Sequence, residues 1–171
     1  MNTKEHIQGN AKVSGYAEVF GNAIVTDEAI VAGNARVAGY AIVSGRAKVS
    51  GDALVSGHAR VSGNAIVAGR AVVADDARVY REANVSGDAV VEGNAVVAGN
   101  ARVFGEGFVS GNAVVEGYAV VTGKARVTGD AHVSGRATIG GDAVIIGGQW
   151  NGSEGEITSG RWLAPRVPEI E

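Results

Sequence analysis

The sequence predicts an all-β solenoid, and three regularities of spacing carry that prediction. A valine or isoleucine recurs every six residues from Ile7 to Ile145, without insertion or deletion. An alanine stands two residues before almost every one of them, and a glycine stands two residues after almost every one. Repetition at a short fixed period is typical of a solenoid, in which each unit is stabilised by its neighbours.

Each six-residue unit predicts a short strand followed by a corner. The alanine and the valine are two residues apart, so they project to the same side of an extended chain. The glycine, often followed by Asn or Asp, reaches a positive φ without strain and therefore suits a corner. A helix would need a period near 3.6 residues and would lose about 1 kcal/mol at each interior glycine. Hairpins would need longer strands. A parallel coil remains, in which each strand pairs with the strand one turn earlier, about 4.8 Å away.

The pattern breaks at four positions. Gly107 replaces the inward alanine, whereas Asp27, Asp75 and Arg81 replace the corner glycine. A non-glycine residue at positive φ is strained. We therefore expect Arg81 either to adopt the left-handed conformation or to form a different corner.

The units resemble the hexapeptide-repeat family, as in Val61-Ser-Gly-Asn-Ala-Ile-Val67 and Val91-Glu-Gly-Asn-Ala-Val-Val97. The resemblance covers residues 7–147 and is greatest to uninterrupted repeat proteins of bacteria and phages. It implies a left-handed parallel β-helix, a triangular prism with three units in each coil. The 24 units would then form about eight 18-residue coils, roughly 38 Å long at the usual strand spacing.

Three segments are expected: a lead-in at 1–6, the β-helix at 7–147, and a short irregular segment at 148–171. The last segment holds both tryptophans and both prolines and lacks the six-residue pattern. We expect it to cap the last core layer, and the alternative is a docking segment for a partner. The large apolar side chains expected in the cap are Trp150, Ile157 and Trp162.

Composition and charge argue against several classes of function. The net charge is −3, which gives no electrostatic case for binding nucleic acid or an anionic membrane. There is no cysteine, and no apolar run is long enough to cross a membrane. The first six residues lack the apolar core of a signal peptide. We expect a cytoplasmic protein without a cofactor.

One face of the predicted prism carries an apolar stripe. Residues 18 apart stack on successive coils, so four outward side chains lie in one row: Leu54, Val72, Val90 and Phe108. A contiguous apolar row favours an interface between copies of the chain, a homo-oligomer. The alternative is that β-branched residues simply favour strands. Arg36 and Arg126 bracket the stripe.

A second face carries a basic pair, Arg60 and Arg78, on successive coils. Like charges about 5 Å apart repel, so an anion, an acidic partner or Asp76 is expected to compensate them. His58 shares the corner with Asp76, and Tyr80 follows Val79. These residues form a candidate patch for an anion or a partner, and ordinary solvated surface is the alternative. The nature of any small-molecule ligand stays open.

The resemblance also raises enzyme activity, because many hexapeptide-repeat proteins are trimeric acyltransferases that use a histidine as general base with acyl-CoA along the prism. Those enzymes often have a loop that interrupts the coils, and this chain has none between Ile7 and Ile145. His132, with Glu116 one coil below, is the one candidate base.

Carbonic anhydrases of the γ class, another branch of the family, bind metal through three histidines. Here His6, His58 and His132 lie far apart along the axis, so we expect no metal site. Our expectation is therefore a non-enzymatic structural or interaction protein. The alternative is an acyltransferase with its site between protomers.

Overall fold

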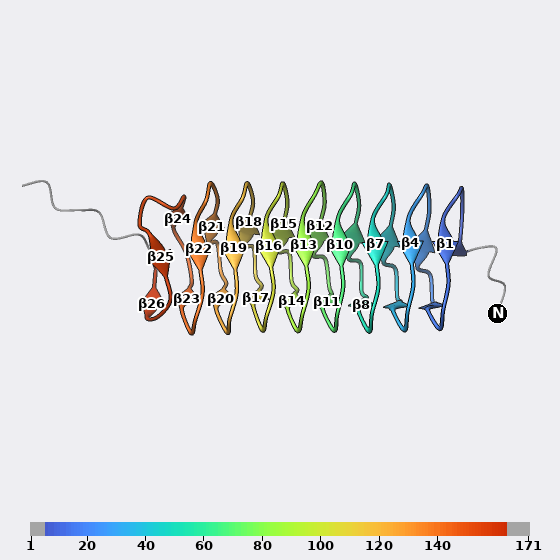
Figure 1. Cartoon of the computed structure of the whole chain (residues 1–171), viewed down its shortest axis with the longest axis horizontal. Coiled ribbons are helices and arrows are strands. Elements are labelled where there is room, and N and C mark those ends of the chain that lie inside the picture. Colours follow the sequence, from blue (N-terminus) through green and yellow to red (C-terminus); the bar gives the residue numbers. More distant parts are fainter. Residues whose placement is uncertain (1–5, 164–171) are drawn as a thin grey trace, which may run out of the picture.

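The computed structural model describes residues 6–163, which form three parallel sheets wound into one β-helix (Figure 1). Residues 1–5 and 164–171, the outer parts of the expected lead-in and C-terminal segment, lie outside the described residues. Every strand is two residues long and is followed by a corner. The expected all-β solenoid is confirmed. The structure contains no helix that is both long and apolar enough to cross a membrane within residues 6–163.

The strands fall into three sheets, here named A, B and C. Sheet A contains β3 (Ile24–Val25), β6 (Ile42–Val43), β9 (Arg60–Val61), β12 (Arg78–Val79), β15 (Val96–Val97), β18 (Val114–Val115), β21 (His132–Val133) and β24 (Gln149–Trp150). Sheet B contains β1 (Lys12–Val13), β4 (Ile30–Val31), β7 (Lys48–Val49), β10 (Ile66–Val67), β13 (Asn84–Val85), β16 (Arg102–Val103), β19 (Val120–Val121), β22 (Thr138–Ile139) and β25 (Glu156–Ile157). Sheet C contains β2 (Glu18–Val19), β5 (Arg36–Val37), β8 (Leu54–Val55), β11 (Val72–Val73), β14 (Val90–Val91), β17 (Phe108–Val109), β20 (Arg126–Val127), β23 (Val144–Ile145) and β26 (Arg161–Trp162).

The register confirms three units to a coil. Within each sheet, a strand pairs in parallel with the strand 18 residues further on, as Val72 does with Val90. Ile7 forms an isolated parallel bridge with Val25 and so begins the same pattern on sheet A. Because parallel pairing uses the backbone groups on both sides of each strand, every interior coil is bonded to the coil above it and the coil below it.

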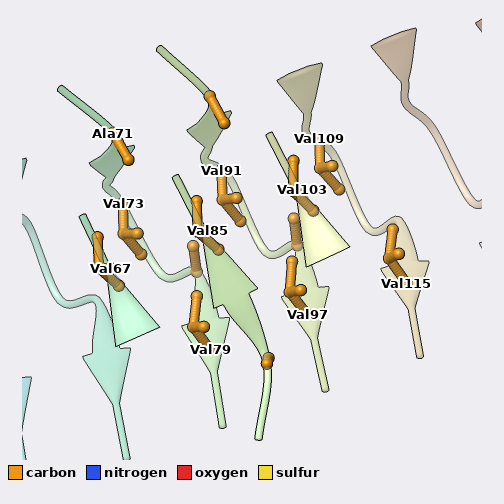
Figure 2. Packing of buried hydrophobic residues seen from close by; sticks show 14 of the residues in the cluster. Val67, Ala71, Val73, Val79, Val85, Val91, Val97, Val103, Val109 and Val115 are labelled. Carbon is orange, nitrogen blue, oxygen red and sulfur yellow. The ribbon is translucent and has the colours of Figure 1, made fainter. Parts of the chain in front are cut away.

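The core consists of stacked columns of valine and alanine (Figure 2). From Ala23 to Ile145, every inward alanine, valine and isoleucine is at most 2 % exposed. Gly107 is buried at its inward position as well. The first coil differs, because its inward residues are only partly buried: Ala11, Val13, Ala17 and Val19.

The corners require the left-handed conformation, and the three non-glycine corners adopt it. The φ angles are 63° at Asp27, 57° at Asp75 and 64° at Arg81, which confirms the expectation for Arg81. Each aspartate accepts a hydrogen bond from a backbone amide on the next coil, Asp27 from Gly45 at 2.8 Å and Asp75 from Gly93 at 3.1 Å. These hydrogen bonds offset part of the strain at the two aspartates.

Arg81→Gly should raise the free energy of unfolding by about 0.5–1 kcal/mol. The substitution removes a left-handed strain of about 1–2 kcal/mol, and the added freedom of glycine in the unfolded chain cancels part of that gain. Asp75→Gly is the matched control. It relieves the same strain but loses the hydrogen bond from Gly93, so its gain in unfolding free energy should be smaller. Chemical denaturation of both variants measures the difference. An Arg81→Gly variant less stable than the parent would contradict the expectation.

The chain closes the C-terminal end with one irregular coil at residues 148–163. Trp150 pairs with Val133, Ile157 with Ile139, and Trp162 with Ile145, so the spacings are 17, 18 and 17 residues. Trp150 is fully buried, and its indole packs edge-on against Trp162 with ring centroids 5.8 Å apart. Two larger rings thus lie where every earlier coil has a valine or isoleucine.

Candidate functional site

The apolar stripe on sheet C is continuous over four adjacent strands. Leu54 on β8 pairs with Val72 on β11, Val72 with Val90 on β14, and Val90 with Phe108 on β17. All four side chains point outward and are half-buried, and the register places each one beside the next along the column. The same columns on sheets A and B are interrupted by polar or charged residues after at most two apolar ones. Sheet C therefore presents the longest apolar row of the described chain.

Arginines stand at both ends of the stripe. Arg126 follows Phe108 in register, and its guanidinium carbon lies 4.6 Å from the centroid of that ring. Arg36 precedes Leu54, contacts the ring of Phe20 at 5.3 Å, and forms an ion pair with Glu18 at 3.4 Å. Cation–π contacts of this kind contribute about 0.5–1 kcal/mol at exposed sites. The stripe is thus apolar at its centre and charged at its two ends.

The basic pair on sheet A is in register, and the contacts of its expected neighbours differ from one residue to the next. Arg60 and Arg78 pair across β9 and β12, and both are exposed. Within residues 6–163, no carboxylate forms an ion pair with either guanidinium, Asp76 included. His58 instead stacks on Tyr40 at the corner, with ring centroids 5.0 Å apart and planes 4° apart. The structure brings the two arginines together and directs His58 to a different partner.

Tyr80 lies on the same strand column as the basic pair, after Val79 of β12, and is half-buried. No aromatic contact or hydrogen bond joins its side chain to the described residues. It therefore borders the basic pair without fixing the position of either arginine.

His132 and Glu116 do form a pair. The Nε2 atom of His132 on β21 lies 2.8 Å from Oε1 of Glu116, and both side chains are partly exposed. A carboxylate in this position orients an imidazole, as it does beside a general base. A pocket of about 390 Å³ lies at the corner around Arg81 and Glu82, and neither His132 nor Glu116 lines it. Within residues 6–163, no three His, Cys, Asp or Glu side chains are grouped to hold a metal ion.

The C-terminal coil has a small pocket of about 170 Å³, lined by Trp150, Glu154, Ile157 and Trp162. The indole N–H of Trp150 donates to the carbonyl oxygen of Gly147 at 2.7 Å, and that of Trp162 donates to Ser159 at 2.8 Å. The three expected cap residues are therefore together, at the end of the core, with both indole N–H groups satisfied.

Among the corner contacts that sequence reasoning missed are two ladders between residues 18 apart. One is the Tyr40–His58 stack. The other joins Asn94, Asn112 and Asp130, whose side chains are hydrogen-bonded at 3.1 and 2.9 Å. Amide and aromatic ladders of this kind stabilise the stacking of identical backbone positions.

The 18-residue spacing places Glu28 beside Arg46, and Arg70 between Asp52 and Asp88, so it predicts ion pairs at these corners. The Nε atom of Arg46 lies 3.0 Å from Oε2 of Glu28, and the Nε atom of Arg70 lies 2.6 Å from Oδ1 of Asp88. The hydrogen bond that Arg70 donates to the Asp88 carboxylate, and then the negative charge of that carboxylate, raise the pKa of the Arg70 guanidinium. These exposed pairs contribute little to stability, and their effect is on register.

No protein-family model matches this sequence. No curated protein matches it either.

Proposed function

We propose that this protein is a non-enzymatic scaffold that self-associates through the flat outer face of sheet C. The observation that carries the proposal is the row Leu54, Val72, Val90 and Phe108 on four adjacent strands. Fully burying an exposed aliphatic or phenyl side chain stabilises by about 1.5–3 kcal/mol. These four are already half-buried, so covering the rest of each contributes part of that value toward the cost of association. In this proposal the β-helix is the rigid body, and the stripe on sheet C is the surface through which two copies contact each other.

A second copy of the chain is the partner that fits this face. Homo-oligomers are mostly closed and symmetric, and a symmetric contact needs a self-complementary patch. Only the apolar centre of the stripe is self-complementary, whereas Arg36, which pairs with Glu18, and Arg126, which lies over the ring of Phe108, stand at its two ends. Polar ends around an apolar centre are the ordinary anatomy of an interface.

The double variant Val72→Glu with Val90→Lys should lower the molecular mass measured by sedimentation equilibrium. The change places charges at the centre of the stripe, where a contact between copies would desolvate them. Val96→Glu with Val114→Lys is the matched control, because these valines are also half-buried and lie on the adjacent strands β15 and β18 of sheet A. If the stripe variant keeps the mass of the parent, sheet C is not the interface.

An acyltransferase with its site between protomers is the second candidate function, and the His132–Glu116 pair is the observation that favours it. A general base needs an oriented imidazole near the substrate proton. The test is release of free CoA from acetyl-CoA with small amine and hydroxyl acceptors, compared between the parent and His132→Ala. Equal, background release by both proteins would remove this candidate.

A further inference from the structure

The two ends of the β-helix are different surfaces. At the C-terminal end, Trp150 and Trp162 cover the core, and their indole N–H groups bond to backbone carbonyls. At the N-terminal end, the inward side chains of β1 and β2, Val13 and Val19, are only partly buried, whereas their counterparts in the next coil are fully buried. The described chain thus leaves one end of its core uncovered.

The backbone at that end has unused hydrogen-bonding groups. Lys12 and Ser14 donate to the coil above, to the carbonyls of Ala29 and Val31. Because successive residues of a strand face opposite neighbours, both the N–H and the C=O of Val13 point away from the β-helix. The same holds for Val19, since Glu18 and Phe20 donate upward to the carbonyls of Ala35 and Val37.

Ile7 completes this edge on sheet A. Gln8 donates to Val25, and Ile7 bridges to Val25, so the N–H and C=O of Ile7 also point outward. Within residues 6–163, no strand pairs with the outer side of β1 or β2. Unpaired edges of this kind are templates for pairing with another chain.

We propose that the N-terminal end pairs with the N-terminal end of a second copy, through antiparallel strands around a two-fold axis at β1. Each six-residue unit advances along the helix axis by one third of the coil spacing. Ile7, Val13 and Val19 therefore lie at three successive heights along that axis. A two-fold axis through Val13 places it opposite the second copy's Val13 and places Ile7 opposite the second copy's Val19. The height differences in the two copies then cancel, so the distance between facing strands is the same on all three sides of the junction.

The register satisfies the backbone and the charges together. Residues directly opposite in an antiparallel hydrogen-bonded pair exchange both N–H···O bonds, and outward-pointing Val13, Val19 and Ile7 each offer both groups. Outside the core, Lys12 lies opposite the second copy's Ser14, and Glu18 lies opposite the second copy's Gln8. No like charges face each other directly, and the partly buried valines become covered.

Other occupants fit this end less well. Head-to-tail stacking would place the regular first coil on a C-terminal coil with two 17-residue spacings, where two indole N–H groups already occupy carbonyls. A second copy supplies all three sides at once.

The sequence supplies a matched pair of test variants, because residues 11–15 and 47–51 are both Ala-Lys-Val-Ser-Gly. Ser14→Lys places lysines opposite each other at the proposed junction, whereas Ser50→Lys makes the same change two coils away. Like charges directly opposite in paired strands are destabilising. Ser14→Lys should weaken end-to-end association by about tenfold, and Ser50→Lys should leave it unchanged.

The experiment is sedimentation equilibrium of the full chain in the Val72→Glu, Val90→Lys background, which separates this contact from the one on sheet C. The background protein should be a dimer, Ser14→Lys should shift it to monomer, and Ser50→Lys should not. A monomeric background protein, or equal masses for Ser14→Lys and Ser50→Lys, overturns the end-to-end dimer. The sheet C proposal is tested separately, by comparing the molecular mass of the parent protein with that of the background protein.

Hydrogen exchange gives an independent measurement that does not depend on a variant. The amides of Val13 and Val19 should be protected at high protein concentration and exchange faster on dilution. Exchange rates that do not change with protein concentration would overturn the proposal. Slow exchange would mean that the chain's own residues pair with the edge, and fast exchange would mean that the edge is solvated.

Discussion

Trp150→Ala should destabilise the C-terminal coil by about 3–5 kcal/mol, the range for removing a buried aromatic side chain. Trp150 is the largest fully buried side chain of the described residues, lies on Val133, and packs edge-on against Trp162. Its loss removes that contact and the indole hydrogen bond to Gly147 together. Because each coil of a solenoid contacts only its neighbours, the loss should first unfold the end and leave the middle coils folded.

Hydrogen exchange resolved by residue is the measurement for this variant. Amides of β24 to β26 should lose protection, whereas those of β9 to β14 should keep it. Leu163→Ala is the control, because Leu163 is 70 % exposed and an exposed substitution changes stability by about 0.5 kcal/mol or less. Uniform loss of protection along the whole chain would show that the coils unfold as one unit.

Val49→Pro should destabilise the protein by about 3 kcal/mol or more, whereas Val13→Pro should cost much less. Lys48 and Ser50 donate to one neighbouring strand, so the amide of Val49 faces the other, β4, where Val49 pairs with Val31. Proline removes that interior hydrogen bond. Val13 has the same local sequence, but its amide points away from the β-helix, and proline is tolerated at a strand edge.

Thermal unfolding of the two proline variants, followed by circular dichroism at a concentration where the chains are monomeric, measures the difference. Equal losses at the two positions would mean that the outer side of β1 is paired within the monomer. Such a result would also contradict the open edge on which the end-to-end proposal depends.

Parts of the surface were predictable and parts were not. The row from Leu54 to Phe108 follows from counting 18 residues, because the register has no slip to disturb the count. The partner of His58 did not follow, since a ring can turn toward either neighbouring coil, and it stacks on Tyr40 rather than joining Asp76. Likewise Arg70 had two candidate carboxylates, and side-chain geometry selected Asp88.

The sequence by itself determined the parallel solenoid, its alanine and valine core and its left-handed corners. Three units to a coil was only implied by the resemblance, and the pairing of residues 18 apart shows it. Each six-residue unit carries its own strand and turn residues, and Arg81, with a φ of 64°, shows that the period imposes the corner even without glycine. Only the tertiary structure decided how the ends differ. Residues 148–163 lack the repeat, so the position of Trp150 over Val133 depends on packing against a finished coil. The edge at Val13 likewise depends on which strands residues 6–163 place beside β1, which no local pattern records.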